Sequence, residues 1–208
     1  RAEAERLSQM KDEFLATLSH ELRTPLNSIQ GWVSVLRSAQ ASAQDRARGL
    51  ETIDRNVRAQ AQLVSDLLDM SRIISGKIQL EVQTVHLHEV IDAALDSVLP
   101  SAEAKGVRVT RMLDTGITPA RGDPDRLQQV LWNLLSNAVK FTPRGGRIQV
   151  ILERVNSHAE IVVEDSGIGV QPQFLPHVFD RFRQADAGIS RRYSDLGIGL
   201  SIVKSLVE

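Results

Sequence analysis

Two long stretches in the first third of the chain show the periodicity of amphipathic helices. Apolar residues of the first stretch recur in steps of three and four: Leu7, Met10, Phe14, Leu18, Leu22, Leu26, Ile29, Val33 and Leu36. The second stretch repeats the pattern through Leu50, Ile53, Val57, Ala61, Val64, Leu68, Ser71 and Ile74. The pattern predicts a helix from near residue 1 to about Ala39, a polar turn over 38–45 with Asp45 as a candidate N-cap, and a second helix that Gly76 ends.

Two apolar stripes joined by a short polar link are typical of a helical hairpin. A two-helix hairpin buries little surface by itself, and pairing two copies into a four-helix bundle would cover both stripes. We therefore expect residues 1–76 to form a dimerisation hairpin that becomes a four-helix bundle in the dimer.

The pattern changes at Lys77, where short alternating segments are mixed with helical ones. Strands are predicted at 77–82, 106–112, 147–154 and 159–164, the last two joined by a hairpin turn over 155–158. Helices are predicted at 85–99, ended by Pro100, and from an N-cap at Asp123 through Ala138. Helices mixed with mostly antiparallel strands indicate an α+β sandwich over 77–208, with helices on one face of a sheet.

Composition narrows the classes of function. The 208 residues carry a net charge of −1, which argues against a broad basic surface for nucleic acid. The absence of cysteine excludes disulfides and thiolate metal sites and fits a reducing compartment. No apolar run approaches the roughly 18 residues that a membrane span needs. The chain begins inside a charged helical segment, which predicts a longer parent protein.

His20 is the first candidate for chemistry. It lies two residues from both Leu18 and Leu22, so it is roughly 200° around the helix from each and points away from the apolar stripe. A neutral imidazole exposed to water is a nucleophile, and a carboxylate, Glu21, follows it directly. A histidine on a polar helix face is usually an ordinary surface residue, and the surrounding string decides between the two interpretations.

That string, FLATLSHELRTPL from Phe14 to Leu26, resembles the phosphoacceptor box of sensor histidine kinases. The resemblance implies that His20 accepts a phosphoryl group, that Glu21 orients the imidazole and takes its proton, and that Thr24 positions a water for removing phosphate from the partner. Pro25 removes a backbone donor and tends to kink a helix, which would let the helix swing between two positions.

Three strings in the second half are candidates for a nucleotide site. Asn133, Asn137 and Lys140 are spaced to share one face of a helix. Amide oxygens suit Mg²⁺ and an ammonium suits phosphate, although a merely polar helix face has the same spacing.

The other two strings are rich in glycine. Asp165, Gly167 and Gly169 follow a predicted strand, where the carboxylate can accept a hydrogen bond from an exocyclic amine and the glycines let backbone approach a flat base. Gly197 and Gly199 open a helix, and helix N-termini bind phosphate. Each string alone is also ordinary turn chemistry.

Their order along the chain, with Phe179 and Phe182 between the glycine strings, resembles the ATP-binding domain of histidine kinases. That domain has the Bergerat-type fold that gyrase, Hsp90 and MutL ATPases share. The resemblance implies that Asn137 is the principal Mg²⁺ ligand, with Asn133 and Lys140 at the phosphates.

The same resemblance gives roles to the glycine strings. Asp165 would bind the adenine amine, and Gly167 and Gly169 would shape the base pocket. Phe179 and Phe182 would anchor a lid over 170–196, although ordinary core burial would explain them in part. The turn that holds Gly197 and Gly199 would contribute to cofactor binding at the far end of this lid.

The chain departs from the family at Ser194 and Asp195, where two glycines usually stand. Losing glycine where φ is positive costs about 1–3 kcal/mol. A carboxylate about 5 Å from a phosphate oxygen repels it by roughly 3 kcal/mol at an effective dielectric of 20. We expect ATP affinity or lid closure to be weakened. The chain also ends at Glu208, so we expect the domain to lack its C-terminal strands.

The hypothesis is the dimeric cytoplasmic core of a sensor histidine kinase that uses ATP and Mg²⁺. Its expected partners are a response-regulator receiver domain docked near His20 and an upstream sensor domain joined through the N-terminal helix, with no nucleic acid and no membrane contact in this chain. A degenerate kinase acting mainly as a phosphatase or partner-binding module is the alternative that Ser194 and Asp195 favour. A Bergerat-type ATPase without phosphohistidine is a second alternative. Four further histidines lack metal-like spacing and are interpreted as structural or surface residues: His86, His88, His158 and His177.

Overall fold

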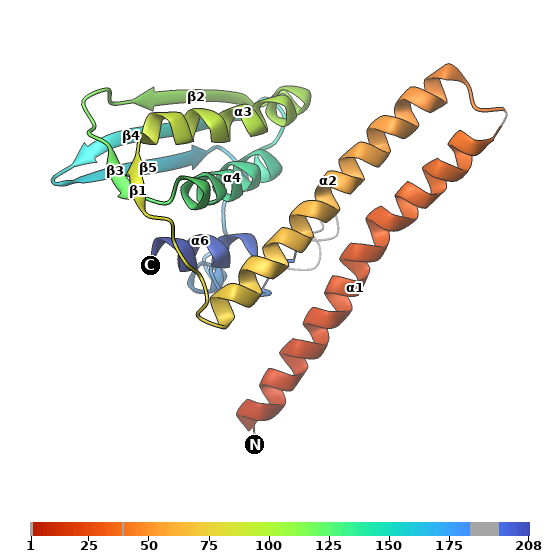
Figure 1. Cartoon of the computed structure of the whole chain (residues 1–208), viewed down its shortest axis with the longest axis horizontal. Coiled ribbons are helices and arrows are strands. Elements are labelled where there is room, and N and C mark those ends of the chain that lie inside the picture. Colours follow the sequence, from red (N-terminus) through yellow and green to blue (C-terminus); the bar gives the residue numbers. More distant parts are fainter. Residues whose placement is uncertain (1, 39, 184–195) are drawn as a thin grey trace. The chain divides into compact units, whose positions relative to one another are not determined.

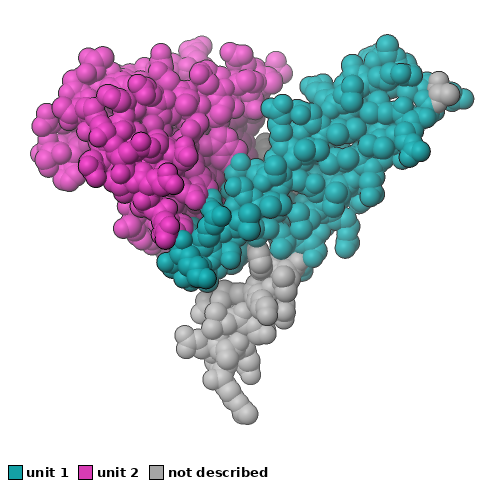
Figure 2. All heavy atoms as spheres, in the orientation of Figure 1, with its two compact units in different colours: residues 1–77, 180–198 teal, residues 78–179, 199–208 magenta. Residues whose placement is uncertain are grey.

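A computed structural model describes residues 2–38, 40–183 and 196–208, which form a helical hairpin and an α/β part (Figure 1). The chain divides into two compact units (Figure 2). One holds 1–77 and 180–198, and the other holds 78–179 and 199–208, apart from residues outside the described ranges. None of the helices in those ranges is both long enough and apolar enough to cross a membrane.

The hairpin consists of α1, Ala2–Arg37, and α2, Ala43–Ile74 (Figure 1). The N-cap of α2 is Ser42, so the expectation of Asp45 at that position was wrong. Asp45 lies three residues on, and the two form a capping box: the Ser42 hydroxyl accepts the Asp45 N–H at 3.1 Å, and the Asp45 carboxylate accepts the Ser42 N–H at 3.2 Å. Hydrogen bonds from Ser42 hold the pKa of Asp45 below its ordinary value.

The two helices approach closely near the turn and are linked by polar side chains further down. A Cβ on Gly49 would lie 2.9 Å from the Trp32 ring, so the small residue permits this packing. The Asn56 side chain donates to the Ser28 hydroxyl at 3.4 Å. The Gln60 side chain donates to the backbone carbonyl of Leu22 at 3.1 Å. Apolar packing and specific polar contacts thus set how α1 lies against α2.

The second unit contains helices and strands that alternate along the chain. They are β1 Gln83–Val85, α3 Leu87–Lys105, β2 Arg108–Leu113, β3 Ala120–Gly122, α4 Pro124–Phe141, β4 Arg147–Val155, β5 His158–Asp165, a short 3₁₀ turn Leu175–His177, and α6 Gly199–Val207. Asp123 caps α4 as expected, accepting the backbone N–H groups of Asp125 and Arg126, with Pro124 in the first turn. The sequence pattern therefore locates the start of α4 correctly.

The main sheet has the order β2-β4-β5, and β1 pairs with β3 in a separate two-stranded sheet. β4 and β5 are antiparallel, as expected for a hairpin. β2 pairs with β4 in parallel, so the sheet is mixed rather than uniformly antiparallel. The reason is that α4 lies between β2 and β4 in the chain and provides the crossover that a parallel pair requires.

Two predicted elements were wrong. Residues 77–82 form no strand, and Leu80 and Val82 are 48% and 49% exposed. Among the described residues no strand pairs with this alternating segment. The helix expected to end before Pro100 runs on to Lys105. Pro100 has no N–H to donate to the carbonyl of Asp96, four residues earlier. Both residues are exposed, so water can bond that carbonyl, and the opposite face of the helix stays packed in the core.

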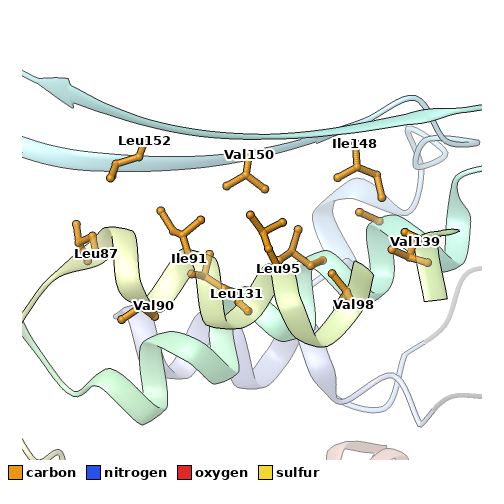
Figure 3. Packing of buried hydrophobic residues seen from close by; sticks show 14 of the residues in the cluster. Leu87, Val90, Ile91, Leu95, Val98, Leu131, Val139, Ile148, Val150 and Leu152 are labelled. Atoms are coloured by element: carbon orange, nitrogen blue, oxygen red, sulfur yellow. The ribbon is translucent and has the colours of Figure 1, made fainter. Parts of the chain in front are cut away.

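The core of this unit lies between one face of the sheet and helices α3 and α4, which confirms a sheet with helices on one face. Figure 3 shows Ile148, Val150 and Leu152 of β4 pointing toward α3. Facing residues of the cluster that Figure 3 labels are Leu87, Val90, Ile91, Leu95, Val98, Leu131 and Val139. Burying a side chain of this size stabilises the fold by about 1.5–3 kcal/mol. This packing fixes α4, the helix that carries the candidate amides.

Candidate functional site

His20 lies on α1 with its side chain 77% exposed, as its helix position predicts. Its Nδ1 atom is 3.6 Å from an Oε1 atom of Glu21, whose side chain is only 13% exposed. That distance is slightly longer than a hydrogen bond. When a carboxylate accepts a hydrogen bond from Nδ1–H, the ring is in the tautomer whose Nε2 carries the reactive lone pair. The geometry therefore presents a nucleophilic nitrogen beside a proton acceptor.

The backbone around His20 is modified by Pro25. Proline supplies no N–H to the carbonyl of Glu21, four residues earlier, so the regular helix ladder is interrupted there. The Thr24 hydroxyl donates to the carbonyl of His20 at 3.1 Å. The Gln60 side chain reaches across from α2 to the carbonyl of Leu22. Side chains thus contact backbone carbonyls on both sides of the interruption.

Asn133, Asn137 and Lys140 share one face of α4. Asn133 is buried, 4% exposed, and its amide donates to the carbonyl of Gln129 at 3.1 Å. Asn137 and Lys140 are half-buried, and the Lys140 ammonium lies 5.1 Å from the ring centroid of Phe141. A buried amide at one end and a lysine at the other suit a ligand that carries both a cation and phosphate oxygens.

Asn133 meets the start of α6. A Cβ on Gly199 would lie 2.8 Å from the amide oxygen of Asn133, a separation that real side chains do not tolerate. Glycine is therefore needed for the N-terminus of α6 to approach the amide. Because the first N–H groups of a helix are unpaired, this approach places anion-binding backbone beside Asn133.

Asp165 ends β5, and the glycine string after it forms a tight turn. The Asp165 Oδ1 atom accepts the Gly167 N–H at 2.7 Å, and the carboxylate forms no other hydrogen bond within the described ranges. A Cβ on Gly167 would lie 2.8 Å from the carbonyl oxygen of Phe141, so the turn rests on the end of α4. The Ile168 N–H donates to that same oxygen at 3.3 Å. The structure therefore brings the Asp165 turn and the end of α4 together.

The remaining sequence-predicted residues lie after this turn. Gly169 has φ +68°, which favours glycine. Phe179 is 44% exposed and does not lie in the core. Phe182 and Gly197 belong to the other compact unit, where the Phe182 N–H donates to the Gly197 carbonyl at 3.2 Å. Phe182 has φ +62°, an unusual conformation for an aromatic residue and typical of functional segments.

Ser194 and Asp195 lie outside the described residues, as does the middle of the lid expected over 170–196. The described histidines apart from His20 fit the structural interpretation. The ring of His88 bonds the carbonyl of Asp114 at 2.9 Å, and the ring of His158 bonds the Ser157 hydroxyl at 3.2 Å.

The second unit has features that a bound nucleotide and metal would fit. Thr142 directly follows α4 and is fully buried, and its hydroxyl has no hydrogen-bond partner among the described residues. An orphaned buried hydroxyl is costly unless a water or ligand satisfies it. The close backbone approaches at Gly167 and Gly199 keep side chains out of the space beside Asn133 and Asp165. Amide oxygens on α4 are suitable Mg²⁺ ligands.

Sequence reasoning missed two residues here. Thr142 stands next to the string of candidate amides, and only its burial distinguishes it from an ordinary turn threonine. Lys105 donates to the carbonyls of Val139 and Lys140, both at 2.7 Å. A lysine at the end of a helix is common, so nothing in the local sequence indicates that it reaches a different helix.

Two family models match the chain. Residues 10–76 match the His Kinase A (phospho-acceptor) domain. Residues 122–208 match the histidine kinase-, DNA gyrase B-, and HSP90-like ATPase domain. The first range contains His20, and the second contains α4, the Asp165 turn and the start of α6.

Curated relatives agree with these domains. The hybrid signal transduction histidine kinase D of Dictyostelium discoideum is 39% identical over 97% of this chain and 16% of its own length. The sensory/regulatory protein RpfC of Xanthomonas campestris is 39% identical over 99% of the chain and 29% of its own length. BarA of Escherichia coli is 35% identical over 99% of this chain and 23% of its own length. The chain thus spans less than a third of the length of these relatives.

Solved structures agree on the fold. Full-length ShkA in complex with AMPPNP has a TM-score of 0.66 and 30% identity, covering 92% of this chain and 40% of that one. The Acinetobacter baumannii histidine kinase AdeS has a TM-score of 0.64 at 22% identity, and the match covers 90% of this chain and 85% of AdeS. The fold, both domain matches and the curated relatives agree, and the chain belongs to the sensor histidine kinase family as a catalytic core.

Proposed function

We propose that this chain is a protein-histidine kinase core that transfers the γ-phosphoryl group of ATP to His20 and then to an aspartate of a response regulator. The observation that carries the proposal is the exposed His20 imidazole with the Glu21 carboxylate 3.6 Å from Nδ1, in a chain whose second unit has the features of a nucleotide site. ShkA was solved with AMPPNP, and ThkA was solved in complex with a response regulator, which supports both partners.

At His20 the reaction forms a nitrogen–phosphorus bond and breaks the bond between the γ-phosphorus and the bridging oxygen of ADP. Nε2 attacks, and the Nδ1 proton lies where Glu21 can accept it. Accepting that proton limits the positive charge on the ring as the new bond forms. In-line transfer of this kind depends mainly on positioning and charge neutralisation. The exposed position of His20 also leaves it accessible to a receiver domain for the second transfer.

In the second unit we assign Asn137 as a Mg²⁺ ligand, with Asn133 and Lys140 at the phosphates. When bound, Mg²⁺ would neutralise charge on the phosphate oxygens. Asp165, whose Oδ1 is fixed by the Gly167 N–H, would accept a hydrogen bond from the adenine amine. The conformational freedom of Gly169 would keep the base pocket open, and the N-terminus of α6 at Gly199 would face the phosphates.

The segment after the Asp165 turn completes the assignment. Phe179 and Phe182 would anchor a lid over the nucleotide, and the turn that holds Gly197 would contribute to cofactor binding. The Phe182 N–H donates to the Gly197 carbonyl, so these two residues are held together, which supports both roles. In the hairpin, Thr24 would position a water for removal of phosphate from the regulator, which would make the chain a phosphatase as well. An upstream sensor domain would act through α1. Because ATP is its proposed substrate, this core would act in the cytoplasm.

Radiolabelled ATP tests the central step. The chain should acquire label that is stable in base and labile in acid, as phosphohistidine is. His20→Gln should abolish the label because the acceptor nitrogen is gone. His158→Gln, which alters an exposed histidine at the β4–β5 turn, should retain it.

Three other results are informative in different ways. Label that survives in His20→Gln would refute His20 as the acceptor. Nucleotide hydrolysis without any label would favour an ATPase without phosphohistidine. Absence of both, with phosphatase activity on a phosphorylated regulator, would favour the degenerate kinase that Ser194 and Asp195 suggest.

A further inference from the structure

Lys105, the last residue of α3, contacts the end of a different helix. Its half-buried ammonium donates to the carbonyls of Val139 and Lys140, both at 2.7 Å. These carbonyls belong to the last turn of α4, where backbone acceptors have no helical donor. A cation there also interacts favourably with the negative end of the helix dipole. Lys105 therefore stabilises the C-terminal turn of α4 from outside the helix.

That turn supports the two parts of the proposed nucleotide site that lie nearest to it. It contains Lys140, and it ends with Phe141, whose carbonyl accepts the Ile168 N–H at 3.3 Å. Gly167 approaches the same carbonyl closely. A rotation of the last turn of α4 would therefore move both the Lys140 ammonium and the support of the Asp165 turn.

Backbone hydrogen bonds that do not involve the Lys105 side chain join the end of α3 to the segment after α4. The Gly145 N–H donates to the Gly106 carbonyl at 2.9 Å, and the Arg108 N–H donates to the Gly146 carbonyl at 3.0 Å. These bonds keep the end of α3 beside the segment after α4 when the lysine side chain is altered. The side chain of Lys105 thus has a narrower effect, on the orientation of the last turn of α4.

We propose that Lys105 is a positioning residue for nucleotide binding, which acts by fixing the last turn of α4 and through it Lys140 and the turn over 165–169. The proposal rests on the proposed function, since it gives a role to a residue that supports the same site. Lys105 would act through its hydrogen bonds to the backbone carbonyls of Val139 and Lys140.

The test compares Lys105→Met, Lys105→Arg and the control Lys77→Met, an exposed lysine outside this contact, in the full chain. Methionine keeps the apolar stem and removes the donors. Amide hydrogen exchange is measured without nucleotide, and AMPPNP affinity is measured by calorimetry. The rate of His20 labelling gives kcat and the KM for ATP. Lys105→Met should raise Kd and KM by about tenfold, the loss expected for charged hydrogen bonds, with kcat within about twofold.

Exchange should become faster at 139–142 and 165–169 while β4 keeps its protection, and Lys105→Arg should restore most of the affinity. Unchanged exchange and affinity in Lys105→Met would overturn the proposal. A uniform increase in exchange throughout the unit would also overturn it, because it would show a general loss of stability. If the unaltered chain binds no nucleotide, the proposed function fails, and the exchange pattern still decides whether Lys105 fixes the turn.

Discussion

Asp195 carries the charge that the sequence predicts to oppose phosphate binding. It stands two residues before Gly197, in a string where the family usually has glycine. A carboxylate near a triphosphate repels it, and a non-glycine residue resists a backbone with positive φ. At about 5 Å and an effective dielectric of 20 the repulsion is roughly 3 kcal/mol before a cation screens it. We therefore expect the charge of Asp195 and the loss of glycine to weaken nucleotide binding together.

Asp195→Asn and Asp195→Gly separate these effects. Removing the charge alone should tighten AMPPNP binding about tenfold, and removing charge and side chain together should tighten it further. Calorimetry at low and high salt checks the assignment, because the gain from Asp195→Asn should shrink as salt screens the carboxylate. Equal affinities for all three proteins would contradict the prediction and leave no reason to regard the site as weakened.

Residue positions on a helix could be predicted because they depend only on local periodicity. The exposure of His20 follows from its angle to Leu18 and Leu22, and the structure confirms it. The contact of Lys105 with Val139 joins residues 34 positions apart, so it depends on how α3 packs against α4. The burial of Thr142 has the same origin. Local patterns identify candidate chemistry, and tertiary packing determines what supports it.

At the scale of elements, a side chain of α2 contacts the turn of α1 in which Pro25 removes a backbone hydrogen bond. Pro25 removes one helical hydrogen bond, and the Gln60 side chain donates to the carbonyl of Leu22 in the same turn. Gln60→Met keeps the length of the side chain and removes the donor. We expect it to lower the free energy of unfolding by about 1 kcal/mol and to speed amide exchange around 22–26.

Gln62→Met is the matched control. Gln62 donates to Asp66 within α2 at 2.8 Å, so its loss affects a local contact worth only about 0.2–0.5 kcal/mol. Denaturant titration gives both stabilities, and exchange locates the change. If the two variants lose the same stability and α1 exchanges normally in both, the contact across the hairpin does not stabilise the interrupted turn.

Elements were predicted well where the pattern was long and poorly where packing competed with it. Asp123 and Pro124 located the start of α4 because caps are local. Pro100 did not end α3, because Val98 and Ala102 are buried on the face that packs into the core. The alternation over 77–82 indicated a strand, but a strand also needs a partner, and the sequence does not show where partners lie.

At the scale of the whole molecule, the hairpin leaves much of its apolar surface uncovered. The stripe predicted from the sequence includes α2 residues that remain about half exposed or more in the single chain: Leu50, Val57, Val64 and Leu68. Leu26 and Val33 on α1 are 45% and 40% exposed. Apolar area of this extent along two long helices favours pairing with a second hairpin in a four-helix bundle. The match to the phospho-acceptor domain supports such a dimer.

Val57→Glu tests the dimer, with Val155→Glu as its control. Val57 is 50% exposed in the middle of α2, and Val155 is 38% exposed at the end of β4, away from the stripe. In a two-fold dimer each substitution occurs twice in one interface. Losing about 1.5 kcal/mol of burial at each copy, with a carboxylate added, should weaken dimerisation at least about 100-fold.

Sedimentation over a range of concentrations measures this, and circular dichroism checks that the helices remain. Val155→Glu should sediment as the unaltered chain does. A Val57→Glu chain that is folded and still dimeric would show that the two copies pair through another surface. A monomeric Val57→Glu chain that still binds AMPPNP would show that the nucleotide site forms within one chain. The apolar stripe would then have the separate role of bringing two His20 side chains into one assembly.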